Sequence, residues 1–229
     1  MTDFLQLLVE PYRTHATWQI VLEIVATLFG IISVYYTYKR DIKVYPTTII
    51  STGIFMFLFF RWGLYGETII QIYYVSMAIY GWLLWQKDLE SHQQQLQVSW
   101  ATKKEYGKAF LFFIASFLFI LIVYYFRPFI ENNFSSEYFS HLKIYYTKID
   151  FIDATTTAVF LVGMWMMAKR KIDNWIFWII GDLIMIPLMI YKGAVITSLQ
   201  YIVLFVISIV GLVDWINVLK TQKNNVKIN

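Results

Sequence analysis

Seven long apolar runs, separated by short polar segments, constrain what this chain folds into. They cover approximately residues 18–38, 45–61, 64–86, 107–126, 152–168, 174–191 and 194–217. Each run has the roughly 17–25 residues that a helix needs to cross the hydrocarbon layer of a bilayer. Barrel strands would instead give alternating segments of about ten residues. The pattern predicts an all-α polytopic membrane protein with seven transmembrane helices.

Composition agrees with this prediction and excludes several kinds of site. Hydrophobic residues make up 59% of the chain, against about 45–50% in soluble domains. Cysteine is absent, which excludes disulfides and thiolate chemistry. The three histidines lie outside the apolar runs without ligand-like spacing, so we expect no metal and no cofactor. Residues 1–16 are predicted to form an amphipathic segment at the membrane interface.

The basic residues predict the orientation of the chain in the membrane. With the N-terminus outside, thirteen of the 19 lysines and arginines fall in inner segments and six in outer ones. Because positive charge is enriched on the cytoplasmic side, this favours an external N-terminus and a cytoplasmic C-terminus. The net charge of +4 is thus explained without nucleic acid, which we do not expect as a partner.

The second half of the chain repeats the first at an offset of 130 residues. The landmarks that fall in register are Lys39-Arg40 with Lys169-Arg170, Gly81 with Gly211, and Trp85 with Trp215. We therefore predict two three-helix repeats, residues 17–86 and 147–216. Residues 87–146 hold an inner loop, a linker helix and an outer loop, and 217–229 form a cytoplasmic tail. The single linker span makes the repeats parallel, as in transporters that bind substrate between repeats.

Polar side chains within the spans are the candidate site residues, because an ionisable group is costly in a bilayer. Asp182 lies about eight residues into its span, close to mid-membrane. Trp175 and Trp178 precede it by seven and four residues, which places all three on one helical face. An aromatic face and a carboxylate together favour a cation. Trp175 alone also fits the interfacial aromatic belt.

Amide and hydroxyl side chains near other span ends complete the candidate site. Glu67 and Gln71 are spaced i, i+4 at the start of the third span, although Glu67 also has Arg61 nearby as a structural partner. Thr197 and Gln200 occupy the start of the seventh span, and Asn174 precedes Trp175. Such groups supply directional contacts to a ligand held between the repeats.

The second repeat resembles a known transporter family. The stretches DNWIFWIIGDLIMIPLMIYKG and LQYIVL, with QIYYVSMAIYGWLLW in the first repeat, are similar to the PnuC-type bacterial vitamin transporters. The NWxxW element at Asn174, Trp175 and Trp178 is the most specific part. The resemblance implies a three-plus-one-plus-three arrangement, a homotrimer in the inner membrane, and facilitated uptake of nicotinamide riboside, a vitamin with a cationic ring. It also implies trapping by a cytosolic kinase, and places Asn174, Trp175, Trp178 and Gln71 at the substrate.

Departures from the family pattern leave the vitamin open. The start of the second span, Lys43 to Pro46, lacks an asparagine that nicotinamide riboside carriers are expected to have, and Asp182 stands where an amide is expected. A carboxylate suits the cationic ring of thiamine equally well. Proton coupling through Asp182 also stays open.

The sequence also bears on two other classes of function, an intramembrane enzyme and a membrane receptor. An intramembrane enzyme would need a nucleophile paired with a base, and no His or Cys lies in the spans, so we expect no enzyme. A non-transporting membrane receptor remains as an alternative.

Overall fold

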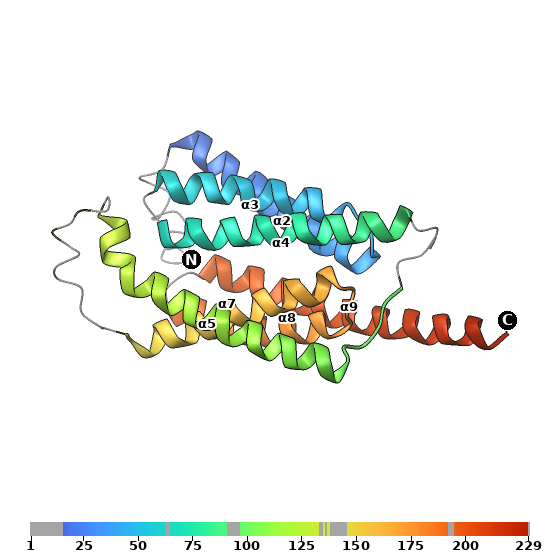
Figure 1. The fold of residues 1–229 in the computed structure, drawn as a ribbon. Helices are drawn as coiled ribbons and strands as arrows, with labels where there is room; N and C mark the ends of the chain where they lie inside the picture. Colours follow the sequence, from blue (N-terminus) through green and yellow to red (C-terminus); the bar gives the residue numbers. More distant parts are fainter. Residues whose placement is uncertain are drawn as a thin grey trace.

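The computed structural model describes residues 16–62, 65–90, 97–132, 135, 137, 146–191 and 195–228 (Figure 1). Within these ranges seven helices are long and apolar enough to cross a membrane, which confirms the predicted all-α, seven-span fold. They are α2 (Thr17–Lys39), α3 (Val44–Arg61), α4 (Tyr65–Glu90), α5 (Lys103–Glu131), α7 (Lys148–Ala168), α8 (Asp173–Tyr191) and α9 (Val195–Ile228). The segment predicted at 1–16 lies outside the described residues, apart from Ala16.

Two helices extend well beyond the apolar runs that predicted them. Helix α5 begins at Lys103 because Thr102 caps it: the Thr102 hydroxyl accepts from the Glu105 amide at 3.3 Å, and the Glu105 carboxylate accepts from the Thr102 amide at 2.9 Å. Helix α9 continues to Ile228, since no glycine or proline interrupts the chain after Trp215. In these two helices the end of the apolar run therefore does not mark the end of the helix.

The helices pack as two groups of three with α5 at the side. Helix α3 contacts α2 and α4, and α8 contacts α7 and α9. The groups meet where α4 contacts α7 and where α2 contacts α9, and α5 packs mainly against α7. In Figure 1 the α2–α4 group forms the upper layer and the remaining helices form the lower one.

Contacts recur between the two groups at the 130-residue offset seen in the sequence. Arg40 and Arg170, which follow α2 and α7, both adopt positive φ, at 57° and 55°. The rings of Tyr45 and Trp85 meet edge-on at 5.2 Å, and those at the equivalent positions, Trp175 and Trp215, meet edge-on at 5.7 Å. A glycine makes room for each ring, Gly81 beside Tyr45 and Gly211 beside Trp175.

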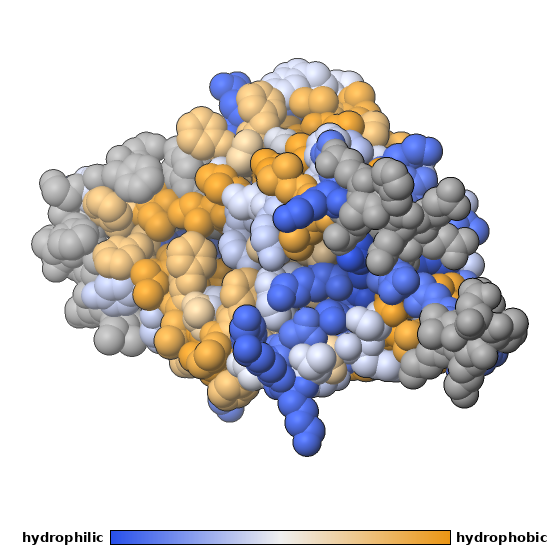
Figure 2. Space-filling model, turned by 45° about the vertical axis from the view of Figure 1, so that its right-hand side comes forward, coloured by the Kyte–Doolittle hydropathy of each residue, from blue (hydrophilic) through white to orange (hydrophobic). Residues whose placement is uncertain are grey.

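Both α2–α3 and α7–α8 turns lie at one end of the bundle, here named the basic end after Lys39, Arg40, Lys169, Arg170 and Lys171. Figure 2 turns this end toward the viewer and shows hydrophilic side chains gathered there. The loop that precedes α5 is hydrogen-bonded to the start of α8. Ile172 N donates to Ser99 O at 3.0 Å, and Ala101 N donates to Asp173 Oδ2 at 2.7 Å. The Tyr106 hydroxyl donates to the other oxygen of Asp173. These hydrogen bonds fix the start of α8, the helix that carries Trp178 and Asp182.

Candidate substrate cavity

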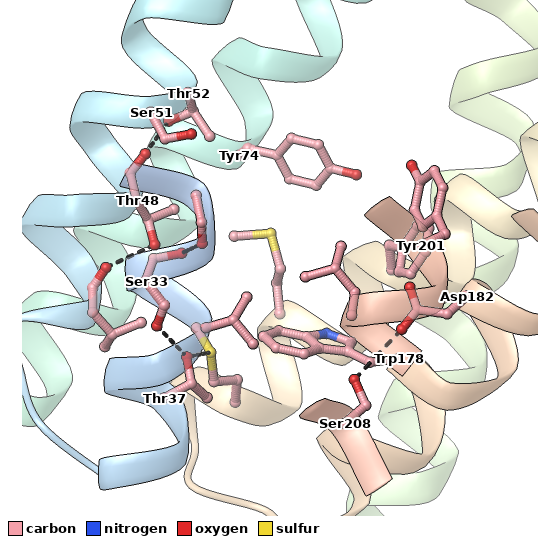
Figure 3. Close-up of a pocket in the computed structure, with 17 residues that line it drawn as sticks. Ser33, Thr37, Thr48, Ser51, Thr52, Tyr74, Trp178, Asp182, Tyr201 and Ser208 are labelled. Carbon is pink, nitrogen blue, oxygen red and sulfur yellow. Dashed lines mark hydrogen bonds between the residues drawn. The ribbon is translucent and has the colours of Figure 1, made fainter. Parts of the chain in front are cut away.

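A cavity of about 260 Å³ lies between the two helix groups. Helices α2, α3 and α4 supply one side, and α7, α8 and α9 supply the other. The lining residues are Gly30, Ser33, Val34, Thr37, Val44, Thr48, Ser51, Thr52, Tyr74, Phe160, Met164, Met167, Trp178, Asp182, Tyr201, Leu204 and Ser208. Figure 3 shows the hydroxyls of α2 and α3 on one side, with Trp178, Asp182 and Tyr201 facing them.

Equivalent positions of the two groups face each other across this cavity. Six pairs that differ by 130 in number line it together: 30 and 160, 34 and 164, 37 and 167, 48 and 178, 52 and 182, and 74 and 204. The side chains in these pairs differ in kind. Thr48 in the first group corresponds to Trp178 in the second, and Thr52 corresponds to Asp182. The cavity is thus lined by pairs of residues at the 130-residue offset and has two chemically different walls.

Trp178 forms the aromatic part of the second wall and is held on two sides. The Trp175 ring meets the Trp178 ring edge-on at 5.4 Å, and Trp175 in turn packs edge-on against Trp215. On the other side lies Gly163, where an added Cβ would stand 2.5 Å from Cδ1 and Nε1 of Trp178. The absence of a side chain at Gly163 is therefore what allows the indole its position.

Replacing Gly163 by alanine is expected to displace the Trp178 indole. A 2.5 Å approach is well below van der Waals contact, so the ring must move or the helices must separate. We expect Gly163→Ala to weaken substrate binding at least 10-fold, measured by equilibrium binding to purified protein. The matched control is Gly53→Ala, where an added Cβ meets no atom within 4 Å. Equal binding by both variants would contradict the placement of Trp178 against the substrate.

Asp182 is the carboxylate of the cavity and is almost fully buried, with 2% of its surface exposed. The hydroxyl of Ser208 donates to its Oδ2 at 3.4 Å, a long hydrogen bond. Among the described residues that line the cavity there is no lysine, arginine or histidine. A buried carboxylate without a cationic neighbour is costly unless a ligand supplies the charge. The cavity is therefore electrostatically suited to a cation.

The structure buries two other predicted site residues, Asn174 and Trp175, away from the surface of the cavity. The Asn174 amide donates to Lys171 O at 2.6 Å, and within the described chain Asn174 Oδ1 and Trp175 Nε1 have no hydrogen-bond partner. Trp175 therefore acts on the cavity through Trp178, which it contacts.

Of the predicted polar residues of α4 and α9, Gln71 and Gln200 are not among the residues that line the cavity. Gln71 and Gln200 are half-buried, and the Gln71 side-chain oxygen is buried without a partner in the described structure. Glu67 and Thr197 have helical backbones, but their side chains lie outside the described residues. A role for these four residues at the substrate stays a prediction.

Sequence reasoning missed the hydroxyl residues that make up the first wall. Ser33 and Thr37 are spaced i, i+4 in α2, and Thr48 and Thr52 have the same spacing in α3 with Ser51 between them. This spacing puts each set on one helical face. Small hydroxyls repeated on one face of an otherwise apolar span were the available signal.

Comparison with known proteins identifies the family. Residues 20–217 match the model of the family described as Nicotinamide mononucleotide transporter. The chain belongs to this family. It is thus a multi-pass membrane protein of a transporter family, as the resemblance in the NWxxW element indicated.

Proteins similar to this chain are named for different substrates. The nicotinamide riboside transporter PnuC of Escherichia coli (strain K12) is 23% identical, over 86% of this chain and 85% of its own. The riboflavin/roseoflavin transporter RibM of Streptomyces davaonensis is 20% identical, over 89% of this chain and 87% of its own. The crystal structure of the vitamin B3 transporter PnuC superposes with a TM-score of 0.61 at 22% identity, over 95% of this chain and 88% of that one. It shows that the fold is shared.

Proposed function

We propose that this protein carries a small cationic vitamin, with nicotinamide riboside as the leading substrate, across the membrane by facilitated diffusion. The observation that carries the proposal is the buried carboxylate of Asp182 in a cavity that Trp178 also lines. A cationic ring supplies the charge that the carboxylate lacks, and it packs favourably against an indole face. Asp182 and Trp178 are thus the residues proposed to hold the ring.

The candidate substrates, riboflavin, the mononucleotide and the riboside, differ in the charge that they would bring to Asp182. Riboflavin has an uncharged ring, which would leave Asp182 without a countercharge. A mononucleotide would bring its phosphate beside Asp182, in a cavity whose described lining residues include no basic side chain. We therefore propose the unphosphorylated riboside. Thiamine, which is also a cation, is the rival substrate that a direct binding comparison excludes or establishes.

Release toward the basic end requires the two helix groups to separate there. Arg40 forms an ion pair with Asp214, and Trp85 Nε1 donates to Ala168 O at 3.0 Å. Both contacts join the α2–α4 group to the α7–α9 group. We propose that the groups are two copies of one unit that rock against each other, which breaks these contacts and opens the cavity inward. The recurrence of contacts at the 130-residue offset supports this proposal.

Crosslinking Arg40 to Asp214 is expected to stop transport while preserving binding. The chain has no native cysteine, so Arg40→Cys/Asp214→Cys is modified only at these two positions by a short bifunctional thiol reagent. We expect the crosslinked protein to bind nicotinamide riboside but not to equilibrate it across liposomes, with recovery after the link is cleaved. The two single-cysteine variants are the controls. Normal transport by fully crosslinked protein would contradict the rocking motion.

We extend the proposal to the cellular setting. The excess of lysine and arginine at the basic end supports a cytoplasmic location for that end and an external N-terminus. Membership of the family supports an inner-membrane homotrimer, with substrate trapped by a cytosolic kinase. The sequence contains no phosphate-binding GxxxxGK[ST] motif, so we do not propose that ATP drives transport directly.

Purified protein in liposomes tests the function. We expect radiolabelled nicotinamide riboside to equilibrate across the bilayer chemically unchanged, and excess unlabelled riboside to compete with it. A receptor would bind the label without passing it, and an enzyme would change it. Stronger competition by thiamine than by the unlabelled riboside would replace the leading substrate by its rival.

A further inference from the structure

We propose that the α2 and α3 side of the cavity is a hydrogen-bond acceptor wall that binds the hydroxyl-bearing part of the substrate. The wall consists of the side-chain oxygens of Ser33, Thr37, Thr48, Ser51 and Thr52. This inference rests on the proposed function and adds to it the orientation of the substrate in the cavity.

Every hydroxyl of the wall already gives its proton to the backbone. The acceptors are Gly30 O for Ser33 at 2.7 Å, Ser33 O for Thr37 at 3.0 Å, Val44 O for Thr48 at 2.7 Å, Ala26 O for Ser51 at 2.8 Å, and Thr48 O for Thr52 at 2.8 Å. Four of these are bonds within one helix turn, a common position for Ser and Thr in helices. The fifth, from Ser51, joins α3 to α2.

A hydroxyl has one proton to donate, so an oxygen whose proton is used can only accept further hydrogen bonds. The wall therefore offers lone pairs to a ligand and no donors. A ligand acceptor placed against it would lose its water partners without replacement, which disfavours binding. Ligand O–H or N–H groups are satisfied there, and the wall selects for them.

The wall has a fixed shape and faces a chemically different one. The bond from Ser51 to Ala26 joins the two helices, and Gly30 lies beside it, with an added Cβ only 3.2 Å from Ser51 Oγ. In the second group Phe160 stands at the position that corresponds to Gly30, and Gly181 at the position that corresponds to Ser51. The glycine is therefore on α2 in the first group and on α8 in the second. The second side therefore offers rings and a carboxylate where the first offers hydroxyl oxygens.

The two walls together define the ligand. A cationic ring lies against Trp178 and Asp182, and a group rich in hydroxyls, such as a ribose, lies against the acceptor wall. Phosphate does not suit the acceptor wall, since phosphate oxygens are acceptors and carry negative charge. This orientation is the one expected of the riboside already proposed. A cation without hydroxyl groups would use only half of the cavity.

The test compares a whole riboside with a ring-only ligand. Thr48→Val/Thr52→Val removes two wall oxygens and keeps the side-chain shape. The control, Thr47→Val/Thr156→Val, removes two hydroxyls of buried residues that are likewise bonded to the backbone but do not line the cavity. Nicotinamide riboside and N-methylnicotinamide, which has the cationic ring but no ribose, are each measured by competition with labelled riboside, up to millimolar concentration.

We expect the wall variant to bind nicotinamide riboside about 10-fold more weakly and N-methylnicotinamide with unchanged affinity, while the control binds both as the wild type does. Equal loss for both ligands, equal loss in the control, or no loss in the wall variant would each overturn the acceptor wall and leave the proposed function intact. Failure of the wild type to bind the riboside would instead overturn the proposed function, and the wall with it.

Discussion

Trp178→Ala is expected to weaken binding of nicotinamide riboside about 30-fold or more. The indole lines the cavity and is held by Trp175 and by the space at Gly163, so its loss removes the face on which a cationic ring packs. A desolvated cation–π contact contributes about 2 kcal/mol, which corresponds to roughly a 30-fold change in affinity. Equilibrium binding to purified protein measures the effect.

Trp215→Ala is the control for this substitution. Trp215 is a fully buried indole of the same size that packs against Trp175 but does not line the cavity. Its removal should lower the thermal stability of the protein, because truncating a buried aromatic side chain costs about 3–5 kcal/mol, and should change affinity far less. Equal losses of affinity in the two variants would show that Trp178 acts only through packing.

Asp182→Asn is expected to remove the preference for a charged ring. The substitution keeps the size of the side chain and removes its charge. A hydrogen bond or close contact to a charged group contributes about 1.5–3 kcal/mol, so the affinity for nicotinamide riboside should fall roughly 10- to 100-fold. Dihydronicotinamide riboside, whose reduced ring is uncharged, should bind the variant and the wild type alike.

Ser208→Ala provides the control at the same place. Its hydroxyl reaches Asp182 only at 3.4 Å, so its loss should change affinity by a few-fold at most. If Asp182→Asn bound the charged and the reduced riboside with the same ratio as the wild type, the carboxylate would not be the partner of the ring.

The sequence predicted the architecture well because membrane helices have a strong local signal. A bilayer requires the backbone hydrogen bonds to be satisfied within each span, so an apolar run of sufficient length has little choice but to be helical. The positions of Trp178 and Asp182 on one face followed from the same regularity. Both line the cavity in the structure.

The cavity lining was harder to predict, because it depends on how the helices pack. Helical spacing placed Trp175 on the face of Trp178, but Gly211 lets the Trp175 ring pack into the core beside Trp215. The serines and threonines of α2 and α3 were overlooked because such residues often satisfy themselves within an apolar helix by bonding to the backbone. Only the arrangement of the two helix groups shows that these oxygens share a cavity with the carboxylate of Asp182.

A structure of the protein with nicotinamide riboside bound at saturating concentration tests the central claim most directly. We expect the pyridinium ring to lie against Trp178, within hydrogen-bonding or ion-pairing distance of Asp182, and the ribose to face the α2 and α3 hydroxyls. A riboside bound elsewhere, with the space between the two helix groups left empty, would contradict the account.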